Sequence, residues 1–390
     1  MSRKELTDIP REMAFPRAEY ARRIEKTRAA MDGPGLDLML VHSLPDICYL
    51  TGFQTPLSDW YHCLILPRDG VPVLQVCDPE LAAMHSYIDT VLPVAWDSMD
   101  SAPAQLTDYL RSIGVEHWRI GVQRRRPGLN PDTETCLRVA LPSAHVIDAS
   151  DLVPALRAVK SEAEIAALRT AARLSTLGME AAVSSIHSGN SENEVAGAAA
   201  QAIIAAGGEY FAIEPIVRAG RRSGVTHATP KRSLIQAGDP VLMEIGGVFK
   251  RYCAPLLRTA VVGPPSARLR QLADTSLAAM DRLFDHLRPG VTAGEIASAA
   301  MGSLDGHDAA FKSRGYFGYS VGIGFPPSWV ERSIEIAVGR GDVLLPGMVF
   351  HTHRALRIPG VMGVGFSESV LITETGYELL TAHPRQLIVL

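Results

Sequence analysis

The chain has 390 residues, of which 47% are hydrophobic and 21% are charged, and its formal net charge is −4. These values are typical of an ordinary globular protein, and the length favours two domains over a single hydrophobic core. The near balance of 38 basic and 42 acidic residues excludes the strongly basic surface that nucleic acid or an anionic membrane attracts. We therefore expect a small-molecule partner, with no nucleic acid and no membrane.

The cysteines and the N-terminal residues lead us to expect a reducing compartment. Its five cysteines are widely spaced and form no Cys-x-x-Cys pair, so neither a disulfide framework nor a zinc knuckle is expected. The first fifteen residues contain no apolar leader segment, and no apolar run reaches the roughly 18 residues of a membrane span. We expect a cytoplasmic protein.

Residues 1–155 are predicted to form an α/β domain. Its helical patterns cover 20–31, 79–87, 102–113 and 132–139. Its short apolar runs, typical of strands, cover 36–41, 47–52, 62–67, 71–76, 117–122 and 145–149. This alternation favours a mixed sheet covered by helices. The loop between the second and third of these runs carries Trp60 and Tyr61 and is expected to project.

A second domain, residues 156–390, is predicted to begin at a helix whose start is marked by Ser161 and Glu164. Such a pair forms a capping box, in which the Ser hydroxyl and the Glu carboxylate bind free backbone amides. From there the chain repeats itself weakly, because 187–196 resembles 288–297 in its Gly turn, capping box and apolar helix start. The repeat predicts a domain with internal pseudo-symmetry, although chance agreement of common turn patterns is the plain alternative.

One acid lies inside an apolar strand of this domain. The sequence predicts a strand at 241–245, a turn at Gly246-Gly247 and a returning strand at 252–262, with Glu244 in the first strand. Burying an unpaired carboxylate costs several kcal/mol, so an acid at this position indicates chemistry. The run from Gly347 to His353 has the same design, with an ionisable sixth residue after the Gly. A local two-fold would bring Glu244 and His353 to one central site.

Several further stretches occur in a characteristic order over 156–376. They are the linker 156–172, His227 in its Thr-His-Ala-Thr loop, Gly238-Asp239, Arg258-Thr259, Gly322-Ile323-Gly324, 344–350 and Glu368 with the residues after it. In these the chain resembles the creatinase, prolidase and methionine aminopeptidase family. The resemblance implies a pita-bread C-terminal domain behind a creatinase-type N-terminal domain, but it does not carry the function with it.

The chain departs from that family at the metal ligands. Peptidases of the family hold two divalent ions with five side chains. By the resemblance, the two aspartates fall on Glu244 and Pro255, and the histidine falls on Val321. The two glutamates fall on His353 and Glu368. Since Pro and Val have no donor atom, the dinuclear site is lost.

The remaining acids and histidine leave two interpretations open. Glu244, His353 and Glu368 could hold one ion of zinc or iron, but the ligand count favours a metal-free site without a cofactor. Metal-free members of the family include creatinase and ectoine hydrolase. The chain is more similar to ectoine hydrolases, in its Glu in the first hairpin strand and in the run 318–329. Creatinase has a glutamate where this chain has Leu257.

The chemistry expected of such a site is opening of a C–N bond in a small amidine or guanidine. Glu244 would act as nucleophile or base, and His227 would move the proton. Glu368 would hold the substrate cation with Glu244, while Arg332 or Arg218 would bind a substrate carboxylate. The other expected substrate-binding residues are His353, Tyr252, Trp329, Phe211, Trp60 and Tyr61. The resemblance implies a homodimer in which Trp60 and Tyr61 reach the partner's site.

Plain structural roles and other functions remain alternatives. His227 would otherwise be a solvated loop histidine, His353 a core partner of Glu368, and Trp329 and Tyr252 core packing. Arg258 is expected to form a structural salt bridge. Two other functions are an Xaa-Pro dipeptidase with a mononuclear metal site and a catalytically inactive binding protein. The ionisable residues that persist favour the hydrolase.

Overall fold

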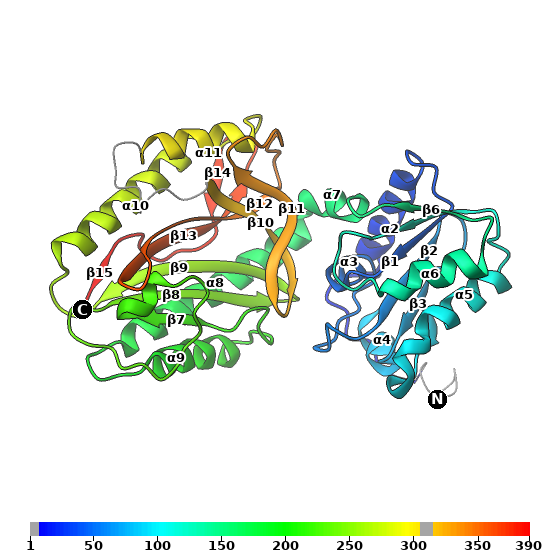
Figure 1. Ribbon diagram of the computed structural model, residues 1–390, viewed down its shortest axis with the longest axis horizontal. Helices are drawn as coiled ribbons and strands as arrows, with labels where there is room; N and C mark the ends of the chain where they lie inside the picture. Colours follow the sequence, from blue (N-terminus) through cyan, green and yellow to red (C-terminus); the bar gives the residue numbers. More distant parts are fainter. Residues whose placement is uncertain (1–7, 305–314) are drawn as a thin grey trace. The chain divides into compact units, whose positions relative to one another are not determined.

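The computed structural model describes residues 8–304 and 315–390, and the chain divides into two compact units. Unit 1 ends at Arg157 and unit 2 begins at Ala158. In Figure 1 the first is coloured blue to cyan and the second green to red. Each unit has its own sheet and its own hydrophobic core, so the mixed α/β fold expected from the sequence is confirmed.

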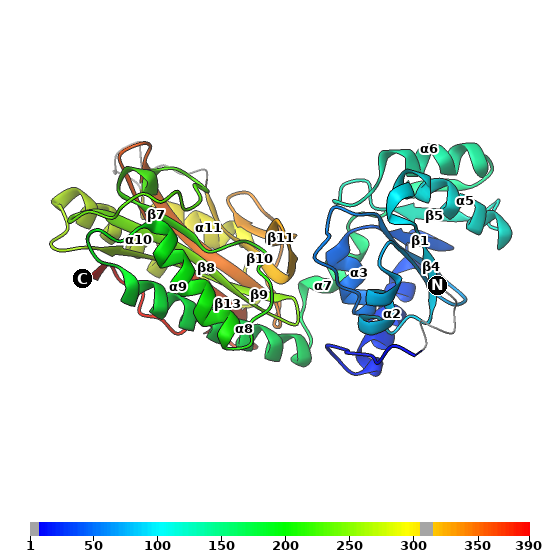
Figure 2. The same ribbon diagram turned by 90° about the horizontal axis from the view of Figure 1, so that it is seen from below.

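Unit 1 is a six-stranded mixed sheet with the strand order β4-β3-β2-β1-β5-β6. Its strands are β1 (Leu38–Val41), β2 (His62–Pro67), β3 (Val73–Val76), β4 (Thr90–Pro93), β5 (Arg119–Val122) and β6 (His145–Asp148). Its helices are α2 (Arg17–Met31), α3 (Leu44–Thr51), α4 (Pro79–His85), the 3-10 helix η1 (Trp96–Ser101), α5 (Ala102–Ser112), α6 (Pro131–Ala140) and α7 (Leu152–Ala158). Figure 2 shows α5 and α6 on one side of the sheet and α2 and α3 on the other.

One expected strand of unit 1 is a helix. The apolar run 47–52 lies in α3, which starts after Ser43 with a proline in its first turn and ends at Gly52 in the left-handed conformation. Every described side chain of α3 except Pro45 is buried. A short helix that is apolar all round has the same composition as a buried strand, so the pattern did not distinguish them.

Unit 2 is a larger, mainly antiparallel sheet with the order β14-β13-β12-β10-β9-β8-β7, to which β11 and β15 pair at β10 and β9. Its strands are β7 (Ile216–Ala219), β8 (Pro240–Phe249), β9 (Tyr252–Val261), β10 (Tyr316–Phe325), β11 (Ser328–Ala337), β12 (Val349–Ile358), β13 (Met362–Ile372), β14 (Tyr377–Leu379) and β15 (Ile388–Val389). Its helices are α8 (Glu162–Ser185), α9 (Glu192–Ala205), the 3-10 helix η2 (Gly220–Gly224), α10 (Ala267–His286) and α11 (Ala293–Gly302).

The internal repeat is visible in unit 2. Helix α8 packs on β8 and β9, and α10 packs on β12 and β13. Both α9 and α11 start with a capping box, at Ser191 and Thr292. Each capping residue also forms an isolated antiparallel bridge, Ser191 with Leu234 and Thr292 with Val343. The expected capping box at Ser161 also forms at the start of α8. The two halves therefore present β8 and β12 as equivalent strands, as the pseudo-two-fold fold requires.

The hairpin of β8 and β9 turns later than the sequence predicts. Strand β8 runs through Gly246 and Gly247, and the turn falls on Lys250 and Arg251, both of which have positive φ. The two glycines serve close packing instead. A Cβ on Gly246 would lie 2.8 Å from the Trp329 ring, and a Cβ on Gly247 would lie 2.6 Å from a backbone oxygen of α8. Glycine inside a strand commonly marks such a close approach.

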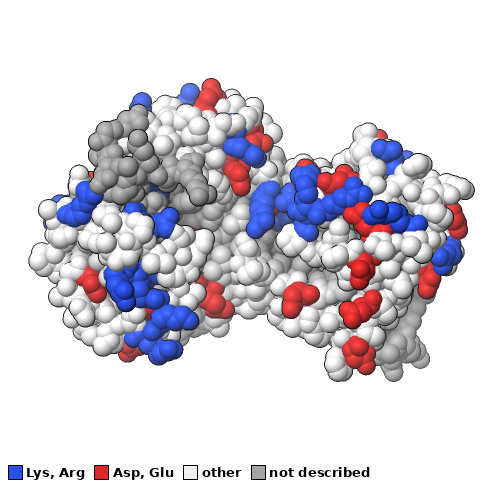
Figure 3. Space-filling view, in the orientation of Figure 1, with Lys and Arg blue, Asp and Glu red and all other residues white. Residues whose placement is uncertain are grey.

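The surface carries charges of both signs. On the face shown in Figure 3, basic and acidic side chains both occur on each unit, with uncharged surface between them. Among the described residues no helix is long and apolar enough to span a bilayer.

Candidate functional site

A cavity of about 1260 Å³ lies within unit 2, over the strands that carry the repeat. It brings together seven of the residues that the sequence predicts for the site. These are Glu244, His227, His353, Phe211, Trp329, Arg332 and Arg218. The cavity is also lined by further charged residues that include Arg354, Arg357 and Glu214. Its walls thus combine a half-buried acid, two histidines, aromatic rings and several arginines.

Glu244 faces this cavity from the middle of β8. Its cross-strand neighbours are Ile216 on β7 and Leu257 on β9, so the carboxylate lies among apolar side chains. Burial raises the pKa of Glu244, and the nearby Arg218 opposes that rise. A carboxylate with a raised pKa is a stronger base than an exposed one and is a common feature of catalytic sites.

Arg218 is the cation beside this acid. Its side chain is 4% exposed, and Nη1 donates to the carbonyl of Val225 at 2.7 Å. Within the described part of the chain its Nε has no hydrogen-bond partner. Burial lowers the pKa of Arg218, while Glu244 raises it. A buried guanidinium with unused donors at a cavity wall can bind an anionic ligand group.

The two histidines of the cavity are neutral at pH 7. His227 lies in the loop after η2, is exposed to the cavity and has a φ of 55°. Burial lowers its pKa, as do Arg218 and Arg357. Burial lowers the pKa of His353 on β12 to about 4, and Arg354 and His227 add to this effect. Each ring can therefore accept a proton.

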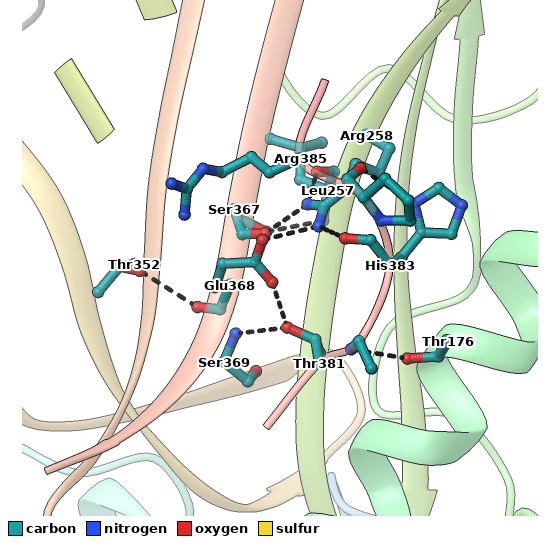
Figure 4. Close-up of polar contacts among 12 residues, drawn as sticks. Thr176, Leu257, Arg258, Thr352, Ser367, Glu368, Ser369, Thr381, His383 and Arg385 are labelled. Atoms are coloured by element: carbon teal, nitrogen blue, oxygen red, sulfur yellow. Dashed lines mark hydrogen bonds and ion pairs between the residues drawn. The ribbon is translucent and has the colours of Figure 1, made fainter. Parts of the chain in front are cut away.

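Glu368 does not belong to the cavity, and the expectation that it binds the substrate is wrong. On β13 it pairs with Thr352, while His353 pairs with Ser367. Because side chains alternate across a strand, Glu368 points to the face opposite His353. There it accepts hydrogen bonds from Arg258 Nη2 at 2.7 Å and from the Thr381 hydroxyl, as Figure 4 shows.

Arg258 has the structural role that was expected of it. It is fully buried, and besides the ion pair with Glu368 it donates to the carbonyls of Leu257, Ser367, His383 and Pro384. This network ties β9 and β13 to the C-terminal segment. The alternative of a pair between His353 and Glu368 is excluded by their opposite faces.

Tyr252 and Tyr61 do not line the cavity either. The hydroxyl of Tyr252 donates to Glu164 Oε1 at 2.9 Å, and its side chain is 1% exposed. Tyr61 belongs to the core of unit 1, where its hydroxyl donates to Gln75 at 3.1 Å. Both hydroxyls satisfy buried acceptors, so neither is available for a substrate. Trp60 packs partly buried against the same core, and its reach to another subunit stays a prediction.

A hydrogen-bonded network that the sequence reasoning missed lies behind the cavity wall. Trp329 Nε1 donates to the Tyr319 hydroxyl at 2.8 Å, and that hydroxyl lies 2.9 Å from His351 Nδ1. His351 Nε2 lies 2.7 Å from the Ser367 hydroxyl, which accepts from the amide of Leu257 at 2.7 Å. The signal for His351 was available, because it precedes His353 by two positions in a strand and so shares its face.

The side chains present do not fit a metal centre of the family type. The positions expected for ligands hold Pro255 and Val321, and on β13 the position on the face of His353 is occupied by Ser367, not by a carboxylate. No group of three or more His, Cys, Asp or Glu with the geometry for a metal ion occurs within residues 8–304 and 315–390. Of the residues at the expected ligand positions, Glu244 and His353 line the cavity, and His227 lines it with them.

Comparisons with known proteins agree with this architecture. Residues 166–374 match the profile of metallopeptidase family M24, and residues 23–159 match the creatinase/prolidase N-terminal domain. An ectoine hydrolase of Halomonas elongata is 29% identical to this chain over an alignment 405 residues long. The alignment covers 97% of this chain and 98% of that protein.

Two solved structures resemble the chain over its whole length. The dipeptidase PepE from Mycobacterium ulcerans is 27% identical with a TM-score of 0.81, over 96% of this chain and 99% of that one. The prolidase from Pyrococcus horikoshii OT3 is 24% identical with a TM-score of 0.81, over 94% of this chain and 100% of that one. The second likeness shows the fold alone.

Proposed function

The chain belongs to metallopeptidase family M24, and within that family we propose that it is a hydrolase that opens a C–N bond of a small zwitterion without a metal ion. The observation that carries this proposal is Glu244, a half-buried carboxylate that faces the cavity beside Arg218. Pro255 and Val321 replace two of the expected metal ligands, and Ser367 is the residue of β13 paired with His353. The likeness to an ectoine hydrolase supports an amidine-type substrate.

The charges of the cavity support a substrate with both a cation and a carboxylate. An amidinium group binds next to the Glu244 carboxylate, with Trp329 and Phe211 beside its planar face. The substrate carboxylate binds Arg218, because this guanidinium is buried and has an unused Nε donor. Arg332, which is exposed at the same cavity, is the weaker candidate for this role.

The reaction that fits these groups is hydrolysis. Glu244 takes a proton from water, whose oxygen adds to the amidine carbon to give a tetrahedral intermediate. The C–N bond then breaks, the carbon keeps the oxygen as an amide carbonyl, and the departing nitrogen receives a proton. His227, which is neutral at pH 7, accepts and returns a proton in this sequence. Direct attack by Glu244 through a covalent adduct is the second route, and mass spectrometry of a quenched single turnover distinguishes the two.

We further propose a cytoplasmic homodimer. The proposal rests on the family resemblance and on the composition, and Trp60 of unit 1 is the residue expected to approach a partner's site. Sedimentation analysis of the purified protein tests the dimer.

The experiment that tests the proposed function is a screen with metal analysis. The purified protein is incubated with ectoine, creatine and Xaa-Pro dipeptides, with and without EDTA, and products are followed by mass spectrometry. We expect hydrolysis of an amidine or guanidine compound that EDTA does not reduce. Cleavage of Xaa-Pro dipeptides that EDTA abolishes and manganese restores would replace this proposal with a dipeptidase, which the likeness to PepE favours as second candidate.

A lack of turnover with every compound would favour a third function, that of a binding protein without catalysis. Binding of the same compounds, measured by calorimetry, separates this outcome from a wrong choice of substrates. A compound that binds but is not hydrolysed would support the binding protein, whereas no binding of any compound would indicate a wrong choice of substrates.

A further inference from the structure

The hydroxyl of Tyr319 stands between a buried network and the cavity. Tyr319 lies on β10, lines the cavity and is 8% exposed. Its oxygen accepts from Trp329 Nε1 at 2.8 Å and lies 2.9 Å from His351 Nδ1. Whether this hydroxyl donates to His351 or into the cavity depends on which nitrogen of His351 carries the proton.

Ser367 determines which nitrogen of His351 carries the proton. Its oxygen accepts from the amide of Leu257 at 2.7 Å and lies 2.7 Å from His351 Nε2, and its side chain is fully buried. Within the described residues the hydroxyl proton of Ser367 has no other acceptor at hydrogen-bond distance. Tyr319 lines the cavity and can donate there, whereas the fully buried Ser367 has only Nε2 of His351 as an acceptor, so Ser367 donates to that nitrogen.

The proton of His351 is therefore on Nδ1. His351 is fully buried, and both of its ring nitrogens lie at hydroxyls with no carboxylate at hydrogen-bond distance among the described residues, so the ring is neutral and carries a single proton. With Nε2 accepting from Ser367, Nδ1 must be the donor, and its partner is the oxygen of Tyr319. The oxygen of Tyr319 then accepts two hydrogen bonds, from His351 and from Trp329.

The proton of Tyr319 has no place left within the network. Trp329 can only donate, and Nδ1 of His351 is already a donor. Among residues 8–304 and 315–390 the Tyr319 hydroxyl makes no other hydrogen bond. Burial, followed by the charge of Glu244, raises the pKa of Tyr319 well above its usual range, so the phenol stays protonated at neutral pH.

We infer that Tyr319 donates a hydrogen bond into the cavity, to the oxygen that adds to the substrate carbon. This assignment rests on the proposed function, in which Glu244, whose charge acts on Tyr319, activates that oxygen. His351 and Ser367 are positioning residues, because they hold the donor direction without touching the substrate. A donor fixed in advance near developing charge stabilises a transition state more than it stabilises the bound substrate.

The direction of the donor can be tested without any substrate. In protein labelled with 15N-histidine, the His351 signals are identified by their loss in His351→Gln, and long-range proton–nitrogen correlations show which ring nitrogen bears the proton. We expect the proton on Nδ1 in the unaltered protein. In Ser367→Ala we expect this single tautomer to be lost, and in Ser367→Thr, which keeps a hydroxyl, we expect it to be retained. A proton on Nε2 in the unaltered protein overturns the inference.

The role of Tyr319 in the reaction is tested by kinetics with the compound that the unaltered protein hydrolyses. Tyr319→Phe is expected to lower kcat about 100-fold with little change in KM. Ser367→Ala keeps Tyr319 and is expected to lower kcat as well, while Ser367→Thr restores it. An unchanged kcat in Tyr319→Phe, or an effect on KM alone, overturns the inference. If no compound is hydrolysed, the proposed function fails while the tautomer still decides the direction of the donor.

Discussion

Arg218 and Glu244 lie on the same face of neighbouring strands, one cross-strand pair apart. Glu244 pairs with Ile216, and Arg218 pairs with Leu242, so each of the two charged residues is a diagonal neighbour of the other. All four side chains line the cavity. The pKa of Glu244 is therefore set by two opposed effects, burial that raises it and the guanidinium that lowers it.

The activity should depend on pH through this pair. Glu244 works as the carboxylate, and its pKa is raised, so kcat should fall as the pH drops through a value above that of an ordinary glutamate. Arg218→Met removes the effect that lowers this pKa, so the acid limb of the kcat profile should move to higher pH. Profiles of kcat against pH for the unaltered protein and for Arg218→Met check this. An acid limb that stays in place or moves to lower pH would contradict the coupling between Arg218 and Glu244.

Loss of the acid itself should abolish turnover. Glu244→Gln keeps the shape of the side chain but removes the base, and we expect kcat to fall by about 10² to 10⁴. Because the carboxylate is costly to bury, the variant should unfold at an equal or higher temperature than the unaltered protein. Glu214→Gln, at an exposed acid of the same cavity, is the matched control and should keep its activity.

Arg218 should determine recognition of the substrate carboxylate. Arg218→Lys keeps the charge but loses the planar fork, and Arg218→Met loses both, so KM should rise in that order, by about 10- to 100-fold for Met. Arg221→Met serves as control, because Arg221 is exposed on η2 and does not line the cavity. A substrate analogue without the carboxylate should bind the unaltered and the Arg218→Met proteins equally. Discrimination between them would refute the assignment.

Glu368 should matter for stability and not for catalysis. Glu368→Gln leaves the buried guanidinium of Arg258 without its counter-charge, which should lower the free energy of unfolding by about 3 kcal/mol. Glu378→Gln breaks the half-exposed pair with Arg169 and should cost less than about 1 kcal/mol. Urea unfolding of both variants gives these values. A loss of kcat in folded Glu368→Gln protein would restore Glu368 to the site.

Gly246 should be intolerant of any side chain. In Gly246→Ala the new Cβ would meet the Trp329 ring at 2.8 Å, and we expect a loss of about 1 to 3 kcal/mol in stability. Because Trp329 also donates to Tyr319, the same change should lower kcat. Gly197→Ala places a methyl group in open space at the cavity on α9. It should leave kcat unchanged and should not lower stability, because Ala is favoured over Gly inside a helix, as thermal unfolding and kinetics can show.

The fold was predictable because its signals are local. The capping boxes at Ser161, Ser191 and Thr292 formed as the sequence indicated. The two apolar strands of the hairpin also formed, although the first continues to Phe249, beyond its predicted end at residue 245. Glu244 and His353 converge because they occupy equivalent strands of the two halves.

Faces and registers of strands were less predictable. Glu368 was assigned to the cavity, but a displacement of one residue along a strand moves a side chain to the opposite face, and only the pairing of β12 with β13 settles which face it takes. The Gly246-Gly247 pair was interpreted as a turn because nothing in the sequence reveals the ring of Trp329 above it. The polar network of Tyr319, His351 and Ser367 joins three strands, so no local sequence pattern predicts it.

The position of Ser367 limits how this protein could change its chemistry. A carboxylate at the β13 position directly opposite His353 would replace Ser367, and the hydroxyl that we infer orients His351 would be lost with it. At this position a ligand for an ion and the orientation of the phenol donor therefore depend on the same residue. A return to metal dependence through this position would remove the alternative machinery in the same substitution.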